Sequence, residues 1–264
     1  MTGAGELPAC EGGCGYKGDG GQLRRGVVCH RTRRGATTLP VERGANYRSC
    51  DGEWRFRDFD TPEQLPAGIS ATTAAEAAAW GTIRVPGNWE VQGHGTPIYV
   101  NTVYEFAPVD PQPPQLPEAT PVGVYFRTFR VPDAWRGRTV YLNFGGAKSG
   151  AYVYVNGREA GYFEDSKNAV RYDITPLLRE GDNDLVVKIY RWSTGSWLEC
   201  QDFWRMSGIE RSVYLSSERR PTGFDFEVVS TLDEGLRAGL FELRLPAASA
   251  SPRHCRCRAP AADG

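Results

Sequence analysis

The sequence has no excess of charge of either sign, because 31 lysines and arginines stand against 32 aspartates and glutamates among 264 residues. This balance argues against binding nucleic acid through bulk positive charge. The sequence also has no apolar run that approaches the roughly 20 residues needed to cross a bilayer. Its first residues lack the apolar core of a signal peptide. These absences predict a soluble, cytoplasmic protein with neither nucleic acid nor a membrane as its partner.

The length excludes a complete catalytic barrel. A (β/α)8 barrel takes about 250 residues by itself, whereas this chain gives most of its residues to strand-like segments. If the chain belongs to a barrel enzyme, we expect the barrel to be absent from it. The tryptophan-containing part also lacks a Ser-His-Asp arrangement, a phosphate-binding glycine loop and a metal-ligand spacing.

The seven cysteines do not form a disulfide framework, because their number is odd and five of them lie before residue 47 or after residue 246. Cys10, Cys14, Cys29 and His30 could be read as zinc ligands. Adjacent Cys29 and His30, however, would struggle to reach two corners of one tetrahedron. We therefore expect free thiols in these terminal stretches.

Tryptophan marks the folded part of the chain, because all seven tryptophans lie between Trp54 and Trp204. Residues 1–46 are rich in Gly and Arg and show neither helical nor strand periodicity, so they cannot bury enough apolar area to offset the entropy of ordering. Residues 246–264 are similarly aperiodic. We expect both termini to be disordered and one domain to fold over residues 47–220.

About seven segments of the folded part alternate apolar and polar residues, which is typical of half-buried strands in an antiparallel sandwich. The clearest hairpin turns at Asn156-Gly157, since this pair tolerates the positive φ angles of a type I′ turn. Helix is expected at Ala71–Ala79 and as a short turn at Thr175–Arg179. Six prolines within 106–123 predict an extended loop. The strand segments are Glu53–Arg57, Val124–Val131, Thr139–Phe144, Ala151–Val155, Arg158–Phe163, Leu185–Tyr190 and Ser212–Leu215.

A second strand pattern starts after Pro221. Residues 223–230 and 239–245 alternate in the same way and are separated by a break at 233–235. Two strands alone are marginally stable and leave an exposed edge. We interpret residues 221–245 as an incomplete hairpin that begins a second β-sandwich.

A dense run of acids and aromatics at 197–205 is the most informative stretch for function. Glycoside hydrolysis uses two carboxylic groups, about 5 Å apart for retention or about 6.5–9.5 Å apart for inversion. Glu199 and Asp202 are the candidates. Indole faces pack on the C–H surfaces of sugars, and carboxylates accept their hydroxyl protons. The structural alternative is that Arg205 merely pairs with a neighbouring acid.

Structural roles are also open for the other candidates. Trp192, Trp197 and Trp204 can simply fill the core. The loop at 85–101 is shaped by Pro, Gly and Asn, and loops at the ends of sandwiches are where ligands are met. Its His94 lies between glycines and is interpreted as a solvated loop residue rather than a ligand or a base.

At five places the chain resembles the N-terminal sugar-binding domain of glycoside hydrolase family 2, and most closely that of the large bacterial-type β-galactosidases. The likeness covers about residues 47–245, and the run Asp-Phe-Trp-Arg-Met-Ser-Gly-Ile is too specific for chance to explain. The motifs that carry the resemblance are Val85–Trp89, Pro97–Asn101, Val155–Gly157, Arg191–Ser193 and Gln201–Arg211.

The resemblance implies a jelly-roll domain, then an immunoglobulin-like sandwich, then a catalytic barrel. The barrel would carry the magnesium ligands and the two glutamates of a retaining mechanism, all absent from this chain. Hydrolysis of terminal non-reducing β-D-galactose residues would therefore belong to the full-length parent enzyme. We expect no catalytic residue in this chain and no activity from it alone.

In that family, an asparagine of the Pro-Ile-Tyr-x-Asn loop and the aspartate of Gln-Asp-x-Trp reach into the active site of the barrel. They correspond to Asn101 and Asp202. By resemblance, both bind galactose hydroxyls and Asp202 also helps to hold a sodium ion, a role that suits a hard oxygen ligand. Cys200 departs from the pattern, because the β-galactosidases usually have a second acid there.

Two other functions stay open at this point. A free-standing carbohydrate-binding module would bind saccharides without a partner, although two side chains at a domain edge form half a pocket. A subunit that docks onto a separate barrel chain would use the loop at 106–123 and the hairpin at 223–245 as its interface.

Overall fold

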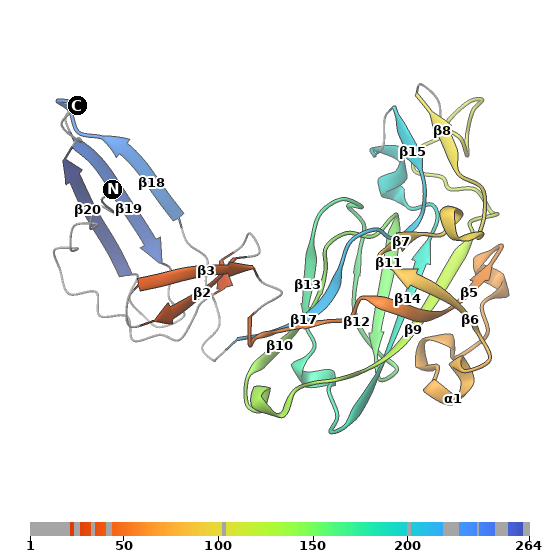
Figure 1. Cartoon of the computed structure of the whole chain (residues 1–264). Helices are drawn as coiled ribbons and strands as arrows, with labels where there is room; N and C mark the ends of the chain where they lie inside the picture. The colour runs from red at the N-terminus through yellow and green to blue at the C-terminus, as the bar shows by residue number, and fades with distance from the viewer. Residues whose placement is uncertain are drawn as a thin grey trace. The chain divides into compact units, whose positions relative to one another are not determined.

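The computed structural model describes residues 22–23, 27–32, 35–40, 44–101, 104–199, 202–218, 227–236, 238–245 and 253–260. The chain divides into two compact units, Leu39–Glu218 and a second unit made of Met1–Thr38 and Arg219–Gly264 (Figure 1). In the described part of the chain, no helix is long and apolar enough to span a bilayer.

A six-stranded antiparallel sheet forms one layer of the larger unit, in the order β12-β11-β14-β9-β5-β6. Alternation decides which side chains face inward. Ala151, Val153 and Val155 are fully buried, whereas the intervening Tyr152 and Tyr154 are half-buried on the other face. The strands are β5 (Gly52–Phe59), β6 (Gly81–Val85), β9 (Val122–Arg130), β11 (Gly150–Val155), β12 (Arg158–Phe163) and β14 (Asp182–Tyr190).

A four-stranded antiparallel sheet forms the second layer, in the order β13-β10-β17-β4. Its central strands contribute buried side chains such as Leu142, Phe144 and Leu215 to the core shared with the first sheet. The prediction of an all-β antiparallel sandwich is therefore confirmed. The strands are β4 (Tyr47–Ser49), β10 (Thr139–Phe144), β13 (Val170–Asp173) and β17 (Val213–Glu218).

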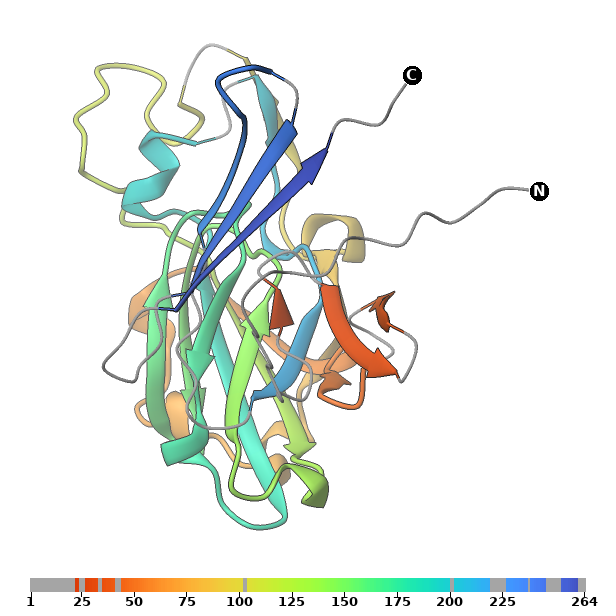
Figure 2. The same ribbon diagram turned by 90° about the vertical axis from the view of Figure 1, so that its left-hand side faces the viewer.

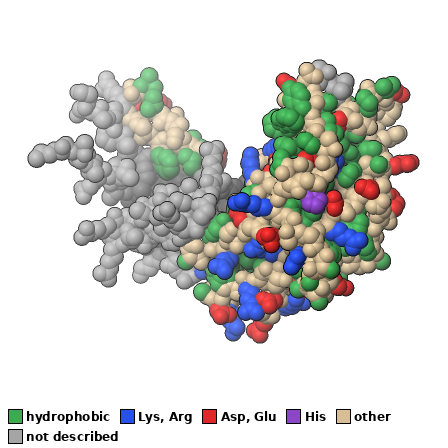
Figure 3. All heavy atoms as spheres, turned by 45° about the vertical axis from the view of Figure 1, so that its right-hand side comes forward, with side chains coloured by type: hydrophobic (Ala, Val, Ile, Leu, Met, Phe, Trp, Pro, Cys, Tyr) green, Lys and Arg blue, Asp and Glu red, His purple; other side chains and the backbone are tan. Residues whose placement is uncertain are grey.

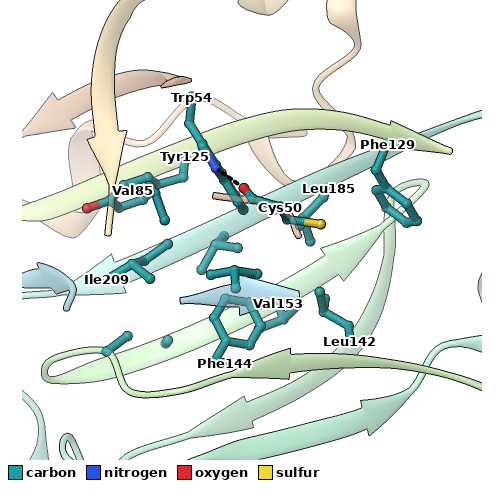
Figure 4. Close-up of a cluster of buried hydrophobic side chains, with 14 of the residues drawn as sticks. Cys50, Trp54, Val85, Tyr125, Phe129, Leu142, Phe144, Val153, Leu185 and Ile209 are labelled. Atoms are coloured by element: carbon teal, nitrogen blue, oxygen red, sulfur yellow. Dashed lines mark hydrogen bonds between the residues drawn. The ribbon is translucent and has the colours of Figure 1, made fainter. Parts of the chain in front are cut away.

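Aromatic side chains with satisfied polar atoms fill the core between the two sheets. The Trp54 indole N–H donates to the Cys50 carbonyl at 2.8 Å (Figure 4). The Trp89 indole N–H donates to the Tyr125 hydroxyl at 2.5 Å. A buried N–H or O–H without a partner would cost about 1–3 kcal/mol, so these pairings allow large amphipathic rings to lie inside.

The hairpin between β11 and β12 turns where the sequence predicts. Asn156 and Gly157 have φ angles of 53° and 76°, as a type I′ turn requires. The Asn156 side chain also donates to the Leu177 carbonyl at 2.9 Å. The turn residues therefore fix the hairpin and tie it to the neighbouring loop.

Helix is shorter than the alanine content predicts. The expected helix at 71–79 is reduced to α1 (Ala74–Ala77), which begins at a capping box between Thr73 and Glu76. Ala77 is buried in a cluster with Phe59, Val122, Val124, Phe126 and Val186, so α1 covers the outer face of the six-stranded sheet. The short 3-10 turns are η2 (Pro62–Gln64), η3 (Ile69–Ala71), η4 (Glu90–Gln92), η5 (Asp133–Trp135), η6 (Thr175–Leu177) and η7 (Thr194–Trp197).

The second unit holds two three-stranded sheets, β1-β2-β3 and β18-β19-β20. The hairpin expected at 223–245 is present as β18 and β19, but β20 pairs with β19 and covers one of its edges. β20 lies within the terminal stretch 246–264 and pairs with β19 through its backbone groups. Cys10 and Cys14 lie outside the described residues. The strands are β1 (Gln22–Leu23), β2 (Val27–Thr32), β3 (Gly35–Pro40), β18 (Glu227–Leu232), β19 (Ala238–Leu245) and β20 (Arg253–Pro260).

Gly123 offers a test of core packing. A Cβ atom there would overlap the Trp89 ring and lie 2.8 Å from Phe56 Cε2. We expect Gly123→Ala to lower the free energy of unfolding by about 1–3 kcal/mol, because buried rings cannot easily move aside. The control is Gly81→Ala, whose Cβ would meet the nearest atom at 3.6 Å. Equal midpoints for the two variants in urea would contradict this packing.

Cys50 offers a test of burial. Its side chain is 2% exposed, and burial raises the pKa of the thiol to about 11 from an ordinary 9.0. Because folding favours the neutral thiol, this contribution to stability is complete below about pH 9 and is lost as the pH rises toward 11. At pH 8 we expect alkylation of Cys50 at least about a hundredfold slower than in urea, measured by peptide mass spectrometry. Equal rates would show that the thiol is accessible.

Candidate functional site

A two-stranded ribbon, β8 (Ile98–Val100) paired with β15 (Phe203–Arg205), lies at one end of the larger unit (Figure 1). Its antiparallel register places Phe203 opposite Val100, Trp204 opposite Tyr99 and Arg205 opposite Ile98. We call it the β8–β15 ribbon. Its two strands are distant in sequence, so the ribbon joins two of the five motifs that carry the family resemblance, Pro97–Asn101 and Gln201–Arg211.

Asn101 and Asp202 lie at the same end of the ribbon. Asn101 directly follows β8 and Asp202 directly precedes β15, so one further step of the register places them opposite each other. Both residues are exposed. The structure therefore brings the two sequence-predicted sugar contacts together on the surface and keeps both out of the core.

The two faces of the ribbon differ. Tyr99 and Trp204 form a cross-strand pair that is 52% and 48% exposed, with a T-shaped ring contact of 5.6 Å between centroids. On the opposite face, Arg205 is buried, whereas Phe203 near the ribbon end is 47% exposed. Asn101 is two residues after Tyr99, at the position that strand alternation assigns to the same face. This exposed face thus combines two aromatic rings with an amide and a carboxylate.

The Asp202 carboxylate is held by Tyr99. The phenol hydroxyl donates to Asp202 Oδ1 at 2.5 Å. This hydrogen bond, together with the negative charge of Asp202, raises the pKa of Tyr99 above its ordinary value. Asp202 has a φ of 50°, in the left-handed region that Asp tolerates better than most residues. The backbone therefore bends sharply just where the carboxylate is presented.

Glu199 does not act with Asp202. Its carboxylate accepts hydrogen bonds from the Ser166 amide at 2.8 Å and from the Ser166 hydroxyl at 2.5 Å. The two acids of the 197–205 run thus serve different neighbours. Cys200 lies outside the described residues.

Arg205 pairs with an acid, as its structural alternative predicts, but the partner lies in the proline-rich loop. Arg205 Nε is 3.1 Å from Glu105 Oε2, and both side chains are at most 7% exposed. Arg205 also donates to the Glu199 carbonyl at 3.1 Å. This buried pair ties β15 to the start of the loop, and the sequence alone gave no signal for it.

Arg191 holds the base of the ribbon. Its guanidinium donates to the carbonyls of Thr96 at 2.8 Å and Arg205 at 3.4 Å, one beside each strand. Glu90 faces it at 3.5 Å and also accepts from the Ser207 amide at 2.9 Å. Burial lowers the pKa of Arg191 even though the Glu90 charge opposes that shift. Arg191 thus links the segments that carry β8 and β15.

The tryptophans have different roles. Trp192 and Trp197 are buried and contact Phe106 at centroid distances of 5.1 and 4.9 Å. Tyr104 packs on Trp197 at 4.6 Å, so these rings anchor the long proline-rich loop that extends from this end of the unit (Figure 2). The core-filling alternative is confirmed for Trp192 and Trp197. It is wrong for Trp204, which is half exposed.

The first half of the loop at 85–101, which holds Asn88 and His94, is structural. The Asn88 side chain donates to the Ser207 carbonyl at 3.4 Å and to Glu210 at 3.2 Å, where β7 (Gly87–Asn88) pairs with β16 (Gly208–Ile209). His94 Nδ1 lies 3.1 Å from Asp58 Oδ2. His94 is thus an ordinary loop residue packed at the surface.

Exposed apolar side chains gather at the ribbon end of the larger unit, as the space-filling view shows (Figure 3). They include Tyr99, Leu198, Phe203 and Trp204. Contiguous exposed apolar patches mark surfaces that contact another protein part or a ligand. Among the described residues, no group of three or more His, Cys, Asp or Glu side chains could hold a metal ion.

A family model described as the sugar binding domain of glycosyl hydrolases family 2 matches residues 47–219, which include the whole sandwich and the ribbon. The chain belongs to glycosyl hydrolase family 2. Within this family 2 domain, the match includes both Asn101 and Asp202.

Two curated relatives and one solved structure show how much of a family 2 protein this chain represents. The chain is 40% identical over 195 residues to a β-galactosidase of Priestia megaterium, covering 73% of this chain and 19% of that protein. It is 37% identical over 236 residues to β-galactosidase 2 of Enterobacter cloacae, covering 89% and 22%. A β-glucuronidase from an uncultured Clostridium species matches with a TM-score of 0.60 at 16% identity, covering 83% and 40%, which shows the shared fold. The chain thus spans about a fifth of the length of these two curated relatives.

The buried Glu105–Arg205 pair can be tested against an exposed one. We expect Glu105→Ala to lower the free energy of unfolding by about 3–5 kcal/mol, because it leaves a buried guanidinium without its counter-charge. The control is Glu180→Ala, which removes an exposed pair with Arg136 at 3.6 Å and should change stability by at most about 1 kcal/mol. Similar urea midpoints for the two variants would contradict the role of this pair as an anchor.

Proposed function

We propose that this family 2 domain is the galactose-contacting part of a β-galactosidase. The observation that carries the proposal is the juxtaposition of Asn101 and Asp202 at the exposed end of the β8–β15 ribbon. Relatives at about 40% identity named β-galactosidase support galactose as the sugar.

The exposed face of the ribbon suits a hexose chemically. The Asn101 amide can donate and accept, while the Asp202 carboxylate accepts from sugar hydroxyls. Tyr99 and Trp204 supply aromatic surface for the C–H face of a ring. These groups cover one side of a sugar, so the remaining contacts would come from the catalytic barrel of the parent enzyme. Hydrolysis needs two acting carboxylic groups and is assigned to that barrel.

A sodium ion beside the sugar is part of the same proposal. Asp202 fits as one hard oxygen ligand, because Tyr99 occupies Oδ1 and leaves Oδ2 and further lone pairs available. Both the Asp202 carboxylate and a sugar hydroxyl oxygen would be ligands of this ion. The other ligands would come from the barrel, as would the magnesium ligands. A cytoplasmic location completes the proposal.

A domain replacement tests the function. Residues 47–219 of this chain would replace the matching domain of the Priestia megaterium β-galactosidase, and kcat/KM for a galactoside would be measured. We expect Asn101→Ala and Asp202→Asn each to lower kcat/KM about 10- to 100-fold, the range for losing a hydrogen bond to a charged or strongly polar group. Asp133→Asn, an exposed change in η5, is the control and should leave it unchanged.

A galactosidase assay on the purified full chain complements the domain replacement. We expect no galactoside hydrolysis above a blank. Turnover by the purified chain, or wild-type kcat/KM for both site variants, would contradict the proposal. Submillimolar galactoside affinity of the chain alone would favour a free-standing binding module, and co-purification with a larger glycosidase chain would favour a docking subunit.

A further inference from the structure

The hydrogen bond between Tyr99 and Asp202 gives Tyr99 a role at the sugar site, an inference that rests on the proposed function. Tyr99 is not a residue that the sequence motifs assign to sugar contact. Its hydroxyl nevertheless reaches Asp202 Oδ1 at 2.5 Å across the ribbon. Within the described part of the chain, Tyr99 is the one hydrogen-bond partner of that carboxylate.

The position of Tyr99 in the register explains this reach. Tyr99 stands directly opposite Trp204, and Asp202 is two residues before Trp204, so Tyr99 and Asp202 are diagonal neighbours on one face. Diagonal neighbours are about 7–8 Å apart at Cα, a distance that a tyrosine side chain spans and most others do not. The T-shaped contact with Trp204 orients the phenol ring for that role.

The Asp202 side chain would have more conformational freedom without a hydrogen-bond partner than a side chain within a strand. Asp202 lies outside β15, with an exposed side chain and a left-handed backbone conformation. An exposed carboxylate without a partner samples several rotamers, and ordering it costs conformational entropy at the moment of binding. A donor that fixes Oδ1 in advance removes that cost and leaves Oδ2 for the ligand.

We propose that Tyr99 is a positioning residue, which holds the Asp202 carboxylate in the rotamer that meets the sugar. Tyr99 acts through Asp202 and need not touch the sugar itself. The preorganised carboxylate then binds a galactose hydroxyl with a smaller loss of freedom.

The test compares Tyr99→Phe with the matched control Tyr141→Phe in the full chain. In Tyr99→Phe, phenylalanine keeps the ring contact with Trp204 and removes the hydroxyl donor. Tyr141 lies on β10 in the four-stranded sheet, where it packs against Arg171, so Tyr141→Phe is a control away from the ribbon. Side-chain NMR couplings of Asp202 report its rotamers. We expect one rotamer in the wild type and in Tyr141→Phe, and averaged couplings in Tyr99→Phe, with equal urea midpoints for all three.

The second readout is kcat/KM for a galactoside, measured with the same substitutions in the domain-replaced Priestia megaterium β-galactosidase. We expect Tyr99→Phe to lower kcat/KM about five- to tenfold, as for one net hydrogen bond. A single Asp202 rotamer in Tyr99→Phe would overturn the positioning role, whatever the kcat/KM. If Asp202→Asn keeps the wild-type kcat/KM in the domain-replaced enzyme, the proposed function fails, whereas the Asp202 rotamers still test the role of Tyr99 separately.

Discussion

The backbone ladder of the β8–β15 ribbon is the constraint on which the candidate site depends. Three residue pairs alone make a marginal ribbon. Two buried guanidinium groups secure it. Arg191 binds carbonyls beside both strands, and Arg205 binds Glu105 on the adjoining loop. Because these contacts hold the register, Asn101 and Asp202 reach the same exposed end of the ribbon.

The sequence predicted the elements whose signals are local. The Asn156-Gly157 turn, the alternating strands and the antiparallel sandwich follow from residue types at short spacing. Asn101 and Asp202 came from motifs with a family resemblance, and the structure places them together. Nothing local predicted Glu105 as the partner of Arg205, because the two are 100 residues apart in the chain and meet only after folding.

The tryptophans show why burial was harder to predict than strand content. Trp197 and Trp204 lie in one aromatic run, yet one is 5% exposed and the other 48%. Trp197 ends a 3-10 turn that packs under the proline-rich loop, whereas Trp204 pairs with Tyr99 on the outer face of the ribbon. The residue type is the same at both positions, so the difference in burial comes from the 3-10 turn that carries Trp197 and the strand register that places Trp204 opposite Tyr99.

The decisive measurement is a crystal structure, soaked with galactose, of the Priestia megaterium β-galactosidase in which residues 47–219 of this chain replace the matching domain. We expect a sugar at the exposed end of the β8–β15 ribbon, with hydroxyls within hydrogen-bond distance of both Asn101 and Asp202. A sugar bound elsewhere, or a structure in which these two side chains point to opposite sides of the ribbon, would contradict it.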